Sequence, residues 1–183
     1  GSARTAATRA PAGCTVTPLD SMTVAGGLGA IASRAAAVAA MGGSAAEAAE
    51  VVRRQIPRHH ISILLDTLDY LQRGGRIGRA RAWLGGMLNI KPIVTVENGE
   101  VGPEERVRSR ARGIERLASG VRSMTEIERV IVQHTDARAD AELLAARIRA
   151  EVPDVPVDVR WIGPVVGVYA GPNCVGAVTV QRI

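Results

Sequence analysis

Residues 64–96, LLDTLDYLQRGGRIGRARAWLGGMLNIKPIVTV, decide the fold that we expect for this chain. The apolar run 61–65 predicts a buried strand that ends at Asp66. A short helix, an Arg-Gly-Gly-Arg turn, a second helix and a strand from Ile90 are expected to follow. Asp66 and Thr67 then lie where a strand of an α/β sheet ends, which is a common place for ligands to bind. The alternative is that Asp66 only caps the next helix.

The residues before this stretch alternate between expected strands and helices. Residues 14–19 predict a strand, and Ser21 or Thr23 could cap a long helix to Met41. Ser44 and Glu47 have the spacing of a capping box, which predicts that a second helix begins there and runs to about residue 55. A strand over 60–65 completes the pattern. Such alternation favours parallel strands.

The pattern changes after Gly78. Residues 90–96 and Val101 flank Asn98-Gly99, a strong signal for a tight hairpin turn. A charged helix over about 107–121, a strand over 127–133 and a helix over 136–151 follow. The last two expected strands cover 155–162 and 175–180. The sequence therefore predicts an α/β protein whose organisation changes near Gly78.

Composition restricts the function classes. The chain has 183 residues with 46% hydrophobic but only 2% aromatic side chains, so its core is aliphatic and can either enclose a smooth cavity or be a plain core. The net charge is +5, and Lys91 is the only lysine. Because the arginines are scattered and stacking surface is scarce, nucleic acid is not expected as a partner, although a basic adaptor remains an alternative.

Reactive side chains are few and badly spaced for catalysis. Cys14 and Cys174 form no metal motif or disulfide framework, and we expect both to be buried in a protein of the reducing cytoplasm. His59, His60 and His134 have no ligand at metal-binding spacing, so no metal, cofactor or catalytic site is expected. No run of ~18 uncharged apolar residues predicts a membrane span.

A set of motifs spread over the chain resembles the DegV family of bacterial fatty-acid-binding proteins. The central motifs are Leu65-Asp66-Thr67-Leu68-Asp69-Tyr70-Leu71, Gly74-Gly75-Arg76-Ile77-Gly78, Leu84-Gly85 and Leu88-Asn89-Ile90-Lys91-Pro92-Ile93. The flanking ones are Asp20-Ser21, Gly27-Leu28-Gly29, Asn98-Gly99-Glu100, Val107-Arg108-Ser109-Arg110, Gly163-Pro164-Val165-Val166-Gly167, Gly171-Pro172 and Gly176. The resemblance covers essentially the whole chain.

The resemblance implies two lobes, with residues 1–72 the remnant of a three-layer α/β/α lobe and residues 73–183 a two-layer α/β lobe. It also implies that a long-chain fatty acid lies between the lobes and presents its carboxylate to a partner such as a fatty acid kinase. The protein would then be a carrier and not an enzyme. The alternative from another class is a phosphotransfer or kinase-like subunit related to dihydroxyacetone kinase.

Two departures from the family pattern affect the expected site. The Thr-Ser-x-Pro-Ser and Ser-Gly-Thr stretches that hold the carboxylate are absent, so we expect an N-terminally truncated member whose first lobe lacks strands. Such a lobe would pair as a homodimer or with a separate N-terminal fragment. Tyr169 stands where the family has His, and a Tyr hydroxyl can donate a hydrogen bond but carries no positive charge.

The expected ligand-binding residues lie in three places. The first is the end of the strand before the central motif, the second an Arg pair, and the third the final Gly-rich loop, whose backbone can approach a ligand closely. Arg76 is expected to pair with an acid or to meet a partner. The full set is Asp66, Thr67, Arg108, Arg110, Gly163, Pro164, Gly167, Tyr169 and Gly171.

Overall fold

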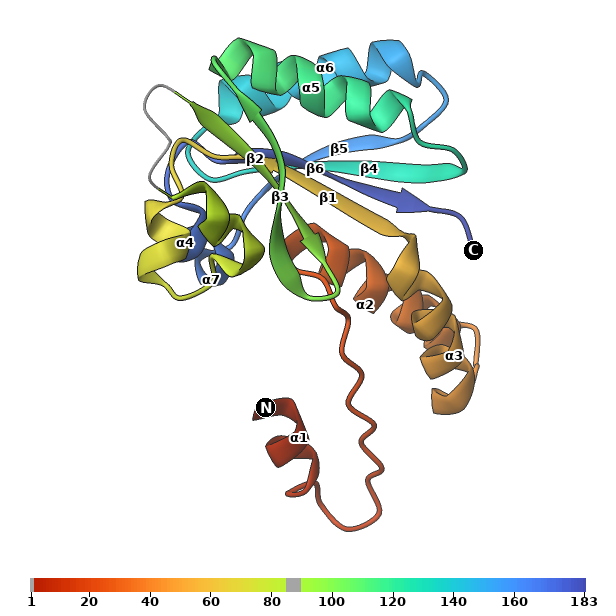
Figure 1. The fold of residues 1–183 in the computed structure, drawn as a ribbon. Coiled ribbons are helices and arrows are strands. Elements are labelled where there is room, and N and C mark those ends of the chain that lie inside the picture. Colours follow the sequence, from red (N-terminus) through yellow and green to blue (C-terminus); the bar gives the residue numbers. More distant parts are fainter. Residues whose placement is uncertain (1, 85–89) are drawn as a thin grey trace.

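Six strands in the described residues, 2–84 and 90–183, form one sheet in the order β3-β2-β1-β6-β4-β5 (Figure 1). This computed structural model confirms the α/β class. The strands are β1 (His59–Leu64), β2 (Lys91–Glu97), β3 (Glu100–Val107), β4 (Ile127–His134), β5 (Val157–Trp161) and β6 (Val175–Gln181). The helices are α1 (Ser2–Ala7), α2 (Ala25–Ala40), α3 (Ala45–Gln55), α4 (Asp69–Arg73), α5 (Arg110–Arg122), α6 (Arg138–Glu151) and α7 (Pro164–Ala170), with the 3-10 turns η1 (Ile56–Arg58) and η2 (Gly78–Trp83).

The expectation of parallel strands, which came from the alternation before residue 66, is wrong for β1, which runs antiparallel to both of its neighbours. Only β4 and β5, joined by α6, are parallel, whereas β1–β2, β2–β3, β1–β6 and β4–β6 are antiparallel. The reason lies between β1 and β2, where α4 and η2 stay beyond the end of β1 and do not cross back over the sheet. The Leu65 N–H donates to the Pro92 carbonyl at 2.9 Å, so β2 begins beside the end of β1.

Local signals predicted several elements correctly. Both reciprocal hydrogen bonds of the capping box join Ser44 and Glu47 at the start of α3. Asn98 and Gly99 form the turn between β2 and β3 with positive φ of 52° and 78°. A turn of this kind needs positive φ at both central positions, which Asn and Gly adopt most easily.

The segment before α2 differs from its expectation. Residues 14–19 form no strand and are exposed, because no strand among the described residues lies beside them to complete a ladder. Helix α2 begins after Val24 without a side-chain cap, so neither Ser21 nor Thr23 caps it. Instead the Gly26 N–H donates to Gln133 Oε1 at 2.7 Å, which attaches the start of α2 to β4.

Helices cover both faces of the sheet. Helices α5 and α6 lie on one face, where Leu64, Ile114 and Leu144 belong to the largest core cluster. Helices α4 and α7 and the η2 turn cover one end of the opposite face and bury Leu65, Leu71 and other side chains. Helix α2 lies beside them, near a third cluster that includes Ile61 and Val178. The two covered faces explain why the central strands are apolar on both sides.

The sheet runs across the expected boundary between residues 72 and 73. Strand β1, which the expected division places in residues 1–72, pairs with β2 and β6 of residues 73–183. The hydrogen bonds of β1 and its apolar side chains thus belong to the shared sheet. A division of the chain into lobes remains a proposal, and the sheet supports a boundary before His59.

Candidate functional site

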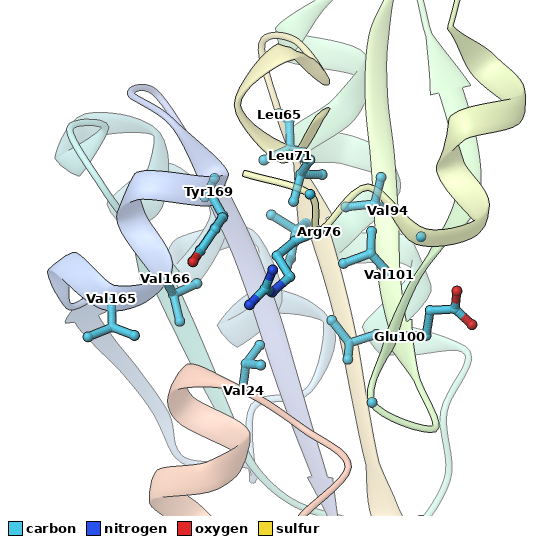
Figure 2. Close-up of a pocket in the computed structure, with 16 residues that line it drawn as sticks. Val24, Leu65, Leu71, Arg76, Val94, Glu100, Val101, Val165, Val166 and Tyr169 are labelled. Atoms are coloured by element: carbon cyan, nitrogen blue, oxygen red, sulfur yellow. The ribbon is translucent and has the colours of Figure 1, made fainter. Parts of the chain in front are cut away.

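An apolar cavity of about 510 Å³ lies between α7, the β2–β3 hairpin, β1 and the start of α2. Figure 2 shows Val165 and Val166 on one side, Val94 and Val101 on the other, and Val24 from the segment before α2. Its side chains come mostly from Val, Leu and Ile, as expected of a chain without Phe. The lining is Val24, Ile63, Leu65, Leu71, Gly75, Arg76, Gly78, Val94, Val96, Gly99, Glu100, Val101, Val165, Val166, Tyr169 and Ala170.

Arg76 and Tyr169 bring polar groups to this cavity. The Arg76 guanidinium extends toward α7, and its carbon lies 5.3 Å from the centre of the Tyr169 ring, within range of a cation–π contact (Figure 2). The turn after α4 admits the ring because residue 74 is Gly. A Cβ at Gly74 would lie 2.2 Å from Tyr169 Cδ1. Gly74 therefore leaves the space that lets Tyr169 lie beside Arg76.

The charge on Arg76 is available to a ligand. Within residues 2–84 and 90–183 no carboxylate forms an ion pair with Arg76, whose Nη1 donates only to the Gly74 carbonyl at 3.2 Å. Glu100, the other charged lining residue, lies on the β3 side of the cavity. A planar guanidinium beside an apolar cavity is well suited to a carboxylate with a long hydrocarbon tail.

Asp66 lies in an ion cluster at the end of β1. Its Oδ1 accepts hydrogen bonds from Lys91 Nζ at 2.9 Å and Arg110 Nη1 at 3.3 Å, and its Oδ2 accepts one from Asn173 at 3.0 Å. Arg110 also donates from Nε to Asp140. The structure thus brings Asp66 and Arg110 together. The guanidinium of Arg110, however, already donates hydrogen bonds to the carboxylates of Asp66 and Asp140.

These contacts also affect the acid–base properties of Asp66. Partial burial acts to raise its pKa, but hydrogen bonds from Lys91 and Asn173 and the charges of Lys91 and Arg110 outweigh it, so the pKa lies below its usual range. The carboxyl therefore stabilises the folded chain above the pKa that it has when unfolded. This contribution is lost as the pH falls through the lower pKa of the folded state.

The remaining expected site residues are dispersed. The Thr67 hydroxyl accepts from the Asp69 N–H at 3.1 Å, and Arg108 is exposed. The expected Gly-rich loop contains α7. Gly163 precedes this helix, Pro164 begins it, Gly167 lies within it, and Gly171, whose carbonyl accepts from the Thr135 hydroxyl, follows it. Of the expected set, only Tyr169 lines the cavity.

Other chemically active groups offer no second site. Burial raises the pKa of the Cys174 thiol to about 12, so it stays protonated and packs as a small apolar side chain. Cys14 is exposed, which corrects the expectation that both cysteines are buried. The part of the chain that the structure describes contains no group of three or more His, Cys, Asp or Glu side chains arranged to hold a metal ion.

The sequence did not identify Arg76 as a residue of this cavity. Its neighbour Tyr169 lies far along the chain, and only the folded arrangement of α4 and α7 joins the two residues. The family motifs at Gly85, Leu88 and Asn89 lie outside the described residues. In the helices that the structure does describe, none has both the length and the apolar character needed to cross a membrane.

Known proteins share both the sequence pattern and the fold. A model of the DegV family of uncharacterised proteins matches residues 1–182. A DegV domain-containing protein from Deinococcus radiodurans is 38% identical in an alignment 185 residues long. The alignment covers 96% of this chain and 63% of the relative. A fatty-acid-binding DegV family protein from Thermus thermophilus has a TM-score of 0.88 at 26% identity, with 99% of this chain and 65% of that chain covered.

A DegV lipid-binding protein from Thermotoga maritima has a TM-score of 0.84, also at 26% identity, with 100% of this chain and 64% of that chain covered. The chain thus spans less than two thirds of the length of each of these three proteins. The family model covers nearly every residue, and the Deinococcus relative supports it with substantial identity. The chain therefore belongs to the DegV family.

Proposed function

We propose that this chain binds a long-chain fatty acid, with the tail in the apolar cavity and the carboxylate at Arg76 and Tyr169. The observation that carries the proposal is an aliphatic cavity with an arginine at its side that forms no ion pair with the described residues. Further support comes from the Thermus and Thermotoga proteins, which are described as binding a fatty acid and a lipid.

Burial of the hydrocarbon tail is the main driving force expected for such binding. Each buried methylene contributes about 0.8 kcal/mol, so a tail of about fifteen carbons gains a gross ~12 kcal/mol. Loss of translational and rotational freedom takes back several kcal/mol or more. The headgroup contact then adds orientation and selectivity more than raw affinity, as polar groups in apolar sites usually do.

The other expected ligand-binding residues enter the proposal in a different role. Asp66 and Arg110 hold the end of β1 to the start of α5 through their ion cluster, beside the core that borders the cavity. Thr67 supports the turn into α4. Arg108 follows β3, is exposed and does not line the cavity, so it has no part in the proposed site.

Removing the charge of Arg76 is expected to weaken palmitate binding about ten-fold in Arg76→Gln, because a charge-assisted hydrogen bond is lost. Tyr169→Phe removes one neutral hydrogen bond and should weaken binding about five-fold. Arg73→Gln is the matched control, since Arg73 ends α4 but does not line the cavity. Titration calorimetry with palmitate gives the three affinities.

Methyl palmitate separates a headgroup contact from a general effect on the cavity. It has the same tail but no carboxylate, so Arg76→Gln should leave its affinity unchanged. An equal loss for palmitate and its methyl ester, or a loss in Arg73→Gln as large as that in Arg76→Gln, would contradict the assignment of the headgroup to Arg76.

We further propose a fatty acid kinase as partner and the cytoplasm as compartment. Arg76 is exposed, so a carboxylate bound there stays within reach of a second protein. Cys14 and Cys174 are free thiols, which fits a reducing compartment. Binding and presentation of the ligand would then be this chain's part in the reaction, and phosphoryl transfer the part of the kinase.

Self-association is expected through the apolar side chains near α2. Leu28 is 50% and Met41 81% exposed, and α1 with the exposed residues 11–19 stands away from the sheet (Figure 1). Sedimentation velocity should show dimers that increase with concentration and decrease in Leu28→Glu. Val168→Glu, at an exposed position on α7, should leave the distribution unchanged. A monomer at every concentration would contradict this expectation.

A further inference from the structure

A small side chamber opens next to the apolar cavity, between the start of α2 and strands β1 and β6. Its volume is about 20 Å³. It shares four lining residues with the main cavity, Val24, Ile63, Val166 and Ala170. The two spaces therefore adjoin, and a ligand in the main cavity would contact side chains that also line the chamber.

The chamber favours an apolar group over water. Its lining includes Ile61 and Val178, which are neighbours in the β1–β6 pairing and are each 3% exposed. Gln133 is the one polar side chain in its lining, and its Oε1 already accepts the Gly26 N–H at 2.7 Å. A buried water needs two to four polar partners, so this lining suits a hydrocarbon group better.

The size of the chamber admits one group. A space of about 10–15 Å³ for the centre of a water-sized sphere holds one such sphere, which is close to the size of a methyl group. The chamber exceeds this requirement only slightly. Its volume therefore corresponds to about one methyl group.

We propose that this chamber receives one methyl group of the bound acyl chain and that Val178 determines its depth, which makes Val178 a specificity-determining residue. The inference rests on the proposed fatty acid binding and adds the class of acyl chain that is selected. The methyl group is either a branch or the end of a straight chain, and the ligands in the test distinguish these sources.

Val178 allows a minimal test because it can be enlarged or shortened. Val178→Ile adds one methylene to the lining of the chamber, whereas Val178→Ala removes two methyl groups from it and enlarges the space. Val180 is the matched control, since it lies on the same face of β6, belongs to the same core cluster and does not line the chamber. Val180→Ile adds the same group to the same strand.

Affinities for myristate, palmitate, stearate and isopalmitate are measured by titration calorimetry for the wild-type chain and the three variants. Isopalmitate has as many carbons as palmitate but ends in a methyl branch. Val178→Ile should weaken binding about four-fold for the ligand whose methyl fills the chamber, which is the contribution of one buried methyl. A loss confined to isopalmitate identifies a branch, and a loss confined to the longer straight chains identifies the chain end.

Val178→Ala should shift selectivity in the opposite direction, and Val180→Ile should leave it unchanged. Thermal unfolding of each variant shows whether it is folded at the temperature at which its affinities are measured. Equal effects of Val178→Ile on all four ligands, or the same selectivity change in Val180→Ile, would overturn the inference while palmitate binding stands. Binding of none of the four ligands by the wild-type chain would overturn the proposed function together with it.

Discussion

Replacing Val166 with Trp is expected to weaken palmitate binding on the order of 50-fold, because the indole takes the place of about three methylenes of the tail. Val166 is half-buried on α7 and lines both the cavity and its side chamber. Affinity is measured by calorimetry, and thermal unfolding shows whether the variant remains folded. The effect should exceed that of any headgroup substitution, since burial of the tail supplies most of the binding free energy.

Val168→Trp is the matched control for this prediction. Val168 lies on the same helix and is 64% exposed, outside the cavity lining. It should bind palmitate like the wild-type chain. If the Val166 variant bound palmitate with full affinity while folded, the tail could not lie in this cavity.

The largest loss of stability is expected at Leu64. This side chain is 0% exposed on β1 and packs so closely against α5 that a Cβ at Gly113 would lie 2.5 Å from Leu64 Cδ2. Leu64→Ala should therefore lower the free energy of unfolding by about 2–5 kcal/mol, because it loses apolar burial and leaves a cavity. Urea denaturation measures the change.

Leu143→Ala makes the same substitution on α6 at a position that is 45% exposed, and its effect should be within about 0.5 kcal/mol. Because Leu64 does not line the cavity, palmitate affinity of the folded Leu64 variant should remain unchanged. Similar losses of stability in both variants would contradict the placement of the core between β1 and α5.

Sequence signals that act over a few residues predicted the structure well. The Ser44–Glu47 capping box and the Asn98-Gly99 turn depend on neighbours only, so their patterns need no knowledge of the remaining fold. The central and flanking motifs together also identified the family correctly, since they lie in order along nearly the whole chain.

Features that depend on distant partners were harder to predict. The direction of each strand follows from where the connecting segment runs, and the short α4 gave no sign that β2 would return beside β1. Residues 14–19 have an alternating pattern but no neighbouring strand among the described residues, and a strand pattern alone cannot form a ladder.

The same limit applies to the candidate site. Asp66 follows a strand as expected, yet its partners Lys91, Arg110 and Asn173 come from three later segments and form an ion cluster around it. The sequence predicts only that Arg76 belongs to an Arg-Gly-Gly-Arg turn and pairs with an acid or meets a partner. Nothing near it in sequence indicates that Tyr169 lies beside it. The pairing of an arginine with an apolar cavity exists only once α7 packs against α4.

Calorimetric titration of the wild-type chain with palmitate at several temperatures shows directly whether this cavity holds a fatty acid. We expect one palmitate per chain and a negative heat-capacity change, which marks the removal of apolar surface from water when the tail enters the cavity. Absence of saturable binding, or binding with no heat-capacity change, would contradict the proposal that this cavity holds a fatty acid.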